Sequence, residues 1–145
     1  MLRAVIDTNV VFEGVTHQGG AAGLIVDAWL ADVFQPCVSN ALAYEYADVL
    51  GRKLSAARLH KVLPVLDALL ETADWIPTFF TWRSSVRDPG DEHVVDCAMN
   101  AGAAIVTFNI RDFRLAERWL GARVWTPSEF VSRLIVALDG ANGDP

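Results

Sequence analysis

Short apolar runs alternate with amphipathic stretches along the whole chain. Two of the apolar runs, Ala4-Val5-Ile6 and Ala104-Ile105-Val106, contain no polar residue, as expected for strands buried on both faces of a parallel sheet. The stretches between such runs have the apolar spacing of helices with one buried face. This alternation predicts an α/β fold with a mostly parallel sheet.

The same pattern gives approximate boundaries for the elements. Strands are expected at residues 3–7, 33–38, near 75, 103–107 and 124–125, and helices at residues 21–31, 39–50, 55–71, 88–101, 113–120 and 128–138. Ser39 and Ser55 are the expected N-caps of the second and third helices, and Pro64 predicts a kink or a break in the third. Three glycines, at positions 14, 19 and 20, predict a loop before the first helix.

Length and composition narrow the class of protein. The 145 residues suit one domain, expected at 1–138, followed by a flexible tail at 139–145. No apolar run approaches the roughly 20 residues of a membrane helix and no secretory signal is visible, so we expect a soluble, cytoplasmic protein without a membrane partner. The two cysteines, Cys37 and Cys97, have no neighbouring Cys or His at zinc-ligand spacing, which disfavours a zinc site or a disulfide framework.

The formal net charge of -6 disfavours general affinity for nucleic acid, because binding to phosphates usually draws on a basic surface. A metallonuclease can still be acidic overall, since its site concentrates carboxylates that a metal ion neutralises. The charge therefore does not exclude a nuclease.

Two apolar runs end in similar polar clusters, Asp7-Thr8-Asn9 and Thr107-Phe108-Asn109. Ligands of open parallel sheets bind beyond the carboxyl ends of the strands, so we expect these clusters to share one crevice. The alternative is that Asp7 or Thr107 simply opens a turn.

Glu45 lies at the edge of an apolar helical stripe formed by Leu42, Tyr46 and Val49, the face expected to pack on the sheet. A carboxylate there would lose part of its hydration and would need a cation or a proton to compensate it. Taken alone, a Glu that bends back to solvent explains the pattern better.

Asp91 falls in line with the apolar positions of its helix, which predicts that it points toward the core. If Asp88 is the N-cap, Asp91 can instead complete a capping box or complement the helix dipole. Glu92, His93 and Asp96 are expected on the solvated face. The three histidines, His17, His60 and His93, show no spacing typical of a catalytic triad or a metal-ligand pair, which disfavours Ser-His catalysis.

The three acids gain meaning as a set, because the topology can bring Asp7, Glu45 and Asp91 to one end of the sheet. Three bare carboxylates in one place repel one another, so they either take up protons or bind a hard divalent cation. Oxygen ligands without Cys or His favour Mg²⁺ or Mn²⁺ over zinc. The sequence therefore indicates a candidate magnesium or manganese site.

In these residues the chain resembles the PIN-domain family, and within it the VapC-type toxin ribonucleases of toxin–antitoxin pairs. The resemblance rests on the order and spacing of Val5-Ile6-Asp7-Thr8-Asn9, Ser39-Asn40, Glu45 with Val49-Leu50, Asp91 with Ala98, and Thr107-Phe108-Asn109-Ile110-Arg111-Asp112-Phe113. It implies a single PIN-like α/β domain in which a five-stranded parallel sheet lies between helices. It also implies a small antitoxin protein as partner and is compatible with a homodimer.

The resemblance assigns roles to individual residues. Asp7, Glu45 and Asp91 take the first three acidic positions of the family. A fourth acid is often found where this chain has Asn109, and Asp112, three residues later, is the candidate to replace it as catalytic and metal-binding residue. The candidates for contact with RNA or water are Thr8, Asn9, Asn109, Arg114 and Arg118.

The chemistry implied is metal-dependent endonucleolytic cleavage of RNA. One or two cations would polarise the phosphate and lower the pKa of a bound water, which attacks in line and leaves a 3′-hydroxyl and a 5′-phosphate.

Two other classes remain as alternatives. A catalytically degenerate PIN-like binding module is consistent with Asn109 in place of the fourth acid. A phosphatase of the haloacid-dehalogenase type also opens with a strand and an Asp, but it requires a second Asp two residues later, where this chain has Asn9. A receiver-like signalling domain is disfavoured because Val38-Ser39 stands where an Asp would end a middle strand.

Overall fold

The computed structural model describes residues 1–81 and 91–142, which form a five-stranded parallel sheet with helices on both faces. The strands are β1 (Arg3–Ile6), β2 (Gln35–Val38), β3 (Asp74–Trp75), β4 (Ala104–Val106) and β5 (Val124–Trp125). Their order across the sheet is β3-β2-β1-β4-β5, and all four neighbouring pairs are parallel. The predicted α/β fold with a parallel sheet between helices is confirmed.

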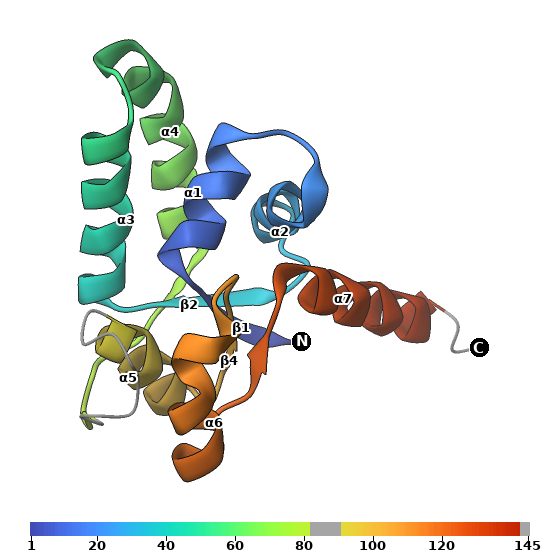
Figure 1. The fold of residues 1–145 in the computed structure, drawn as a ribbon. Coiled ribbons are helices and arrows are strands. Elements are labelled where there is room, and N and C mark those ends of the chain that lie inside the picture. Colours follow the sequence, from blue (N-terminus) through green and yellow to red (C-terminus); the bar gives the residue numbers. More distant parts are fainter. Residues whose placement is uncertain (82–90, 143–145) are drawn as a thin grey trace.

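The helices connect the strands and cover the sheet from both sides (Figure 1). They are α1 (Thr8–Thr16), α2 (Gly20–Leu30), α3 (Asn40–Lys53), α4 (Ala56–Thr72), α5 (Glu92–Ala101), the short 3-10 helix η2 (Ile110–Phe113), α6 (Arg114–Leu120) and α7 (Pro127–Asn142). In Figure 1, α1 to α4 lie on one side of the sheet, and α5 and α6 on the other. None of the helices in the described part of the chain is long and apolar enough to span a membrane.

The sheet has a switch point between its central strand, β1, and the neighbouring strand β4. From β1 the chain proceeds to β2 and β3 on one side, and it then crosses back through α5 to β4 and β5 on the other. The connections on the two sides therefore diverge at the carboxyl ends of β1 and β4, which is where open α/β sheets bind ligands.

The segment after β1 is helical where the sequence predicted a loop, so that prediction was wrong. Gly14 lies inside α1, where a Cβ would come within 2.5 Å of the Ala22 carbonyl oxygen and of Val26 Cγ2. The glycine is thus required by close packing of α1 on α2 and does not break the helix. Gly19 and Gly20, with φ of 85° and 70°, do make the turn between the two helices.

The predicted caps of α3 and α4 are confirmed. Ser39 Oγ accepts a hydrogen bond from the Leu42 N–H at 3.2 Å, and Ser55 Oγ accepts one from the Arg58 N–H at 3.3 Å. α4 continues through Pro64, so the proline does not break the helix. α5 ends at Gly102 in the left-handed conformation, as predicted, whereas its predicted start at Asp88 lies outside the described residues.

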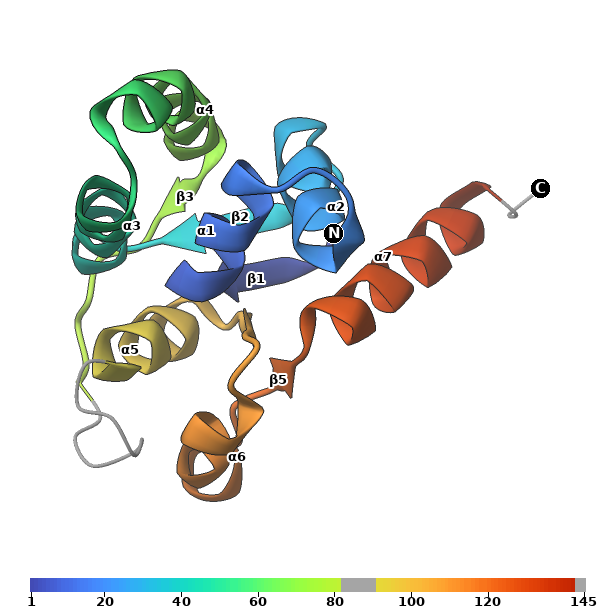
Figure 2. The same ribbon diagram turned by 45° about the horizontal axis from the view of Figure 1, so that its top comes forward.

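α7 begins in the core and ends away from it. Phe130 is fully buried against Phe34 and Trp125, with ring centroids 5.0 Å and 5.9 Å away. Beyond it, Ile135 and Val136 are exposed, and Figure 2 shows the helix running outward from the sheet. The helix reaches Asn142, within the segment where we expected a flexible tail.

Candidate active site

Asp7 stands where β1 ends and α1 begins, and only 5% of its surface is exposed. Its Oδ1 accepts a hydrogen bond from the Thr8 N–H at 2.8 Å, and its Oδ2 accepts one from the Thr107 hydroxyl at 2.7 Å. Because Thr107 follows β4, the second bond shows that the two polar clusters after β1 and β4 meet, as predicted. Asp7 also caps α1, so the turn-forming role and the place in the crevice coexist.

Burial dominates the electrostatics of Asp7. Loss of hydration raises the pKa of this carboxyl, and the nearby charge of Glu45 raises it further. Hydrogen bonds from Thr107 and Thr8 and the proximity of His93 act in the opposite direction without cancelling the effect. Asp7 is therefore a carboxylate whose charged form would be stabilised by an added cation.

Glu45 reaches the same end of the sheet because the next residue fixes α3 there. Tyr46 is buried, and its hydroxyl donates a hydrogen bond to the Ile6 carbonyl oxygen, at the last residue of β1. Burial also raises the pKa of Tyr46 well above its ordinary value, so the hydroxyl stays a donor. The side chain of Glu45 is only 33% exposed, which agrees with its predicted place at the edge of the buried stripe.

His93 corrects the sequence interpretation. It was expected to face solvent, but its side chain is only 25% exposed, and its Nε2 contacts Glu45 Oε2 across two helices. Burial alone would lower the pKa of His93, but the hydrogen bond to Glu45 and the charges of Glu45, Asp7 and Asp91 raise it. No local spacing could have revealed this contact, because 48 residues separate the two partners in the sequence.

Asp91 lies at the N-terminal end of α5, one residue before the helix, and is half-buried. Its side chain makes no capping hydrogen bond to the helix, and its charge acts on His93. It was expected inside the helix, at the third position after an Asp88 cap. As the residue before the helix it contributes a charge that raises the pKa of His93.

Asn109 and Asp112 follow β4, the strand that ends at Val106. Asp112 belongs to η2, and no hydrogen bond or ion pair in the described chain joins its side chain to Asp7 or Glu45. Asn109 is exposed, and its N–H donates to the Thr107 hydroxyl oxygen at 3.0 Å, the same hydroxyl that donates to Asp7. Asn9 is exposed on the first turn of α1. The roles given to these three residues stay predictions.

Arg114 and Arg118 are exposed on α6, where they line a pocket of about 560 Å³ together with Ile110, Leu115 and Glu117. The Arg118 guanidinium lies 5.6 Å from the ring centroid of Trp119, a mostly exposed side chain. The pocket wall thus carries two cations and one acid, and the exposed ring of Trp119 follows Arg118 in the chain.

The site has the right donors for a hard cation but no complete ligand set. Among the described residues, the buried Thr8 Oγ1 has no hydrogen-bond partner, and the buried Glu45 Oε2 has no partner besides His93. Within residues 1–81 and 91–142, however, no three His, Cys, Asp or Glu side chains are close enough to hold a metal ion together. The donor atoms of Asp7, Glu45 and Thr8 are nevertheless all oxygens, the type of ligand that Mg²⁺ and Mn²⁺ prefer.

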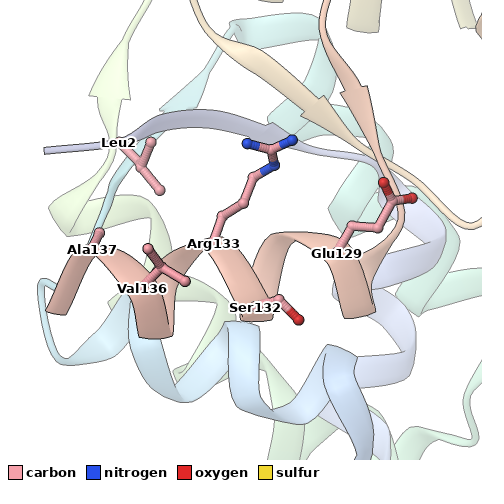
Figure 3. Close-up of a pocket in the computed structure, with 6 residues that line it drawn as sticks. All are labelled: Leu2, Glu129, Ser132, Arg133, Val136 and Ala137. Atoms are coloured by element: carbon pink, nitrogen blue, oxygen red, sulfur yellow. The ribbon is translucent and has the colours of Figure 1, made fainter. Parts of the chain in front are cut away.

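Figure 3 shows another pocket, formed by the start of the chain and by α7. It measures about 510 Å³ and is lined by Leu2 and by Glu129, Ser132, Arg133, Val136 and Ala137 of α7. The Arg133 guanidinium sits 4.3 Å from the ring centroid of Trp125. None of the candidate site residues lines this pocket.

The family assignment follows from the sequence match together with this fold. The family model described as PIN domain matches residues 3–111, which include Asp7, Glu45 and Asp91. The chain belongs to the PIN-domain family. No curated protein matches the sequence significantly.

Several solved structures of bacterial proteins share this fold. VapBC2 from Rickettsia felis, bound to a DNA fragment from its promoter, has a chain with a TM-score of 0.61 and 12% identity; the match covers 86% of this chain and 98% of that one. FitAcB from Neisseria gonorrhoeae matches with a TM-score of 0.60 and 14% identity over 86% and 97%. DNA-bound VapBC from Salmonella typhimurium matches with 0.61 and 16% over 88% and 99%. At these identities the similarity establishes the fold alone.

Proposed function

We propose that this PIN-domain protein is a magnesium- or manganese-dependent endoribonuclease and the toxin of a toxin–antitoxin pair in the cytoplasm. The observation that carries the proposal is the buried Asp7 carboxylate beside Glu45, at the carboxyl ends of β1 and β4. A buried acid with a raised pKa, flanked by a second acid, has a charge that a bound cation would compensate.

The residues around the switch point would have two roles, binding of the metal and positioning of its ligands and of the substrate. Asp7, Asp91 and Glu45 would hold the metal. When bound, the metal would polarise the phosphate and lower the pKa of a water molecule. Thr107 orients Asp7 through its hydroxyl, so the carboxylate enters the site in one fixed rotamer. Thr8 has a buried hydroxyl without a partner, which suits a hydrogen bond to water or to a phosphate oxygen.

The RNA backbone would approach from the side of η2 and α6. Arg114 and Arg118 are exposed cations four residues apart on one helix, and Asn9 and Asn109 offer amide donors and acceptors near the strand ends. Such contacts read phosphate and place the chain, without selecting a base sequence. Against an overall charge of -6, these local cations are the surface where a polyanion can dock.

An antitoxin protein fits the acidic character of the site. The proteins named VapBC and FitAcB among the structural neighbours support a protein partner for this chain. An antitoxin segment would place an Arg among Asp7, Glu45 and Asp91, where charge-assisted hydrogen bonds replace the metal. Expression of the chain alone should arrest growth, and coexpression of the product of the adjacent gene should restore it. Harmless expression alone and purification without a small companion would contradict this partner.

The test of the activity is a cleavage assay with defined RNA pools in the presence and absence of Mn²⁺ or Mg²⁺. We expect cleavage only with metal, loss of cleavage with a chelator, and products that carry a 5′-phosphate. The same pools made of DNA are the matched control for the choice of substrate.

One observation favours a second candidate, a PIN-like binding module without catalysis. Asn109 replaces an acid and Asp112 contacts neither Asp7 nor Glu45 in the described chain, so the ligand set is short of a fourth carboxylate. Titration of the purified chain with Mg²⁺ separates the two: a degenerate module need not bind the ion, and the nuclease must. A chain that neither binds Mg²⁺ nor cleaves RNA would support the binding module.

A further inference from the structure

His93 is the one histidine that the fold brings to the candidate active site, and the function proposed above does not use it. It lies in the first turn of α5, two residues after Asp91, and its Nε2 contacts Oε2 of Glu45 on α3. Both side chains are largely covered, at 25% and 33% exposure, and the charges of Asp7 and Asp91 also act on the imidazole. The imidazole therefore touches one candidate metal ligand and lies close to two others.

The contact fixes which Glu45 oxygen is left for a cation. Oε2 is buried and has no partner besides His93, so the exposed third of the side chain lies elsewhere on the residue. The hydrogen bond requires a proton on Nε2, which both the neutral Nε2–H tautomer and the imidazolium carry. His93 can thus hold Oε2 in either state, which makes Oε1 the oxygen that would bind the cation.

The other ring nitrogen indicates that packing alone does not explain this histidine. Nδ1 is buried without a hydrogen-bond partner, and an unsatisfied buried polar atom costs about 1–3 kcal/mol. An apolar residue would fill the same space without that cost. The contact with Glu45 is what distinguishes His93 from such a residue.

We propose that His93 is a positioning residue, which orients Glu45 for the divalent cation by holding its Oε2. The inference rests on the proposed function, since it assumes that Glu45 is a metal ligand. Partners that hold a ligating side chain from behind typically change metal affinity by about 10–100-fold when they are removed.

The experiment is calorimetric titration of the full-length protein with Mn²⁺ and with Mg²⁺, at one fixed pH, for the parent and three variants. His93→Ala removes the donor and should weaken binding by roughly 10–100-fold. His93→Gln places an amide N–H about as far from the backbone as Nε2 and should bind within a few-fold of the parent. His17→Ala is the matched control, because His17 also contacts a glutamate, Glu13, but at the exposed end of α1; its binding should equal that of the parent.

A kinetic readout separates positioning from a structural role. The Mg²⁺ concentration for half-maximal cleavage should rise in His93→Ala, while the rate at saturating Mg²⁺ falls much less. Equal metal affinity in His93→Ala and the parent, or equal weakening in the Ala and Gln variants, would overturn the positioning role and leave the proposed function intact. A parent that binds no divalent cation would overturn the proposed function and this inference with it.

If His93→Ala does not fold, His93→Gln is compared with His93→Asn, whose shorter amide cannot reach Glu45. Only the Asn variant is then expected to lose affinity for the metal.

Discussion

The described residues include two histidine–glutamate pairs of the same chemistry in different surroundings. His17 and Glu13 lie four residues apart on α1, with Nδ1 and Oε2 at 3.7 Å and side chains 62% and 50% exposed. His93 and Glu45 come from different helices and are 25% and 33% exposed. The first pair is screened by water and contributes little. The second sits where charges interact through protein, and it shares that environment with Asp7 and Asp91.

The difference teaches that environment, and not residue type, decides which pair belongs to a site. With Asp7 as the N-cap of α1 and His17 as its C-cap, a rise of about 1.5 Å per residue puts Glu13 roughly 9 Å and His17 roughly 15 Å along the helix from Asp7. The Glu13–His17 pair therefore provides an internal control for the Glu45–His93 pair in each experiment.

The largest effect is expected at Asp7, the acid on which the buried region centres. Asp7→Asn removes a ligand charge and keeps nearly the same shape, so cleavage should fall by more than about 100-fold with the fold intact. Asp27→Asn, at an exposed position of α2, should cleave RNA at the parental rate. Circular dichroism checks the fold, and rates are measured at saturating Mg²⁺. An Asp7→Asn protein that cleaves as fast as the parent would show that the site is assigned wrongly.

The next effect tests the comparison directly by making the same change in both pairs. Glu45→Gln should weaken Mg²⁺ binding by roughly 10–100-fold, because one carboxylate ligand is lost. Glu13→Gln should leave the affinity unchanged. Calorimetric titration of both variants against the parent measures the contrast. Similar affinities for the two variants would place Glu45, like Glu13, outside the metal site.

A smaller effect concerns the fourth acid. Because Asp112 makes no described contact with Asp7 or Glu45, Asp112→Asn should lower cleavage by less than about threefold. Asn109→Asp adds a carboxylate next to Thr107 and should reduce the Mg²⁺ concentration needed for half-maximal cleavage by several-fold. A severe loss in Asp112→Asn would instead mean that Asp112 supplies the fourth ligand and moves to reach it. Unchanged metal dependence in both variants would leave catalysis to Asp7, Glu45 and Asp91 alone.

The smallest effect is on stability without metal. The pKa of Asp7 is raised in the folded chain, so the unfolded state loses this proton first as the pH rises above the ordinary pKa of 3.8. Stability attributable to Asp7 therefore falls through that window and stays lower at neutral pH, and Asp7→Asn should melt roughly 2–4 °C higher at pH 7 in the presence of a chelator. The gain should vanish below pH 3.8, where Asp7 is protonated in both states. Glu13→Gln should change the melting temperature by less than about 1 °C at either pH. A gain for Asp7→Asn that persists at low pH would point to packing rather than charge.

The sequence by itself determined the parts that depend on local pattern. Apolar runs such as Ala4-Val5-Ile6 specified the strands, and Ser39 and Ser55 specified helix starts, because capping and burial act over a few residues. It also predicted that Asp7 and Thr107 meet, since parallel strands end at one edge of the sheet. The prediction of a loop at Gly14 was wrong, because glycine is typical both of loops and of close contacts between helices.

Only the tertiary structure decided what surrounds each acid. The packing of α5 against α3 turned His93 from an apparent surface residue into the partner of Glu45, and the buried Tyr46 brought α3 to the end of β1. Helical periodicity gives the face on which a residue lies but not the neighbour across that face, because contacts between distant segments depend on how whole helices pack. The charge and hydration of Asp7, and hence its capacity for chemistry, follow from those contacts.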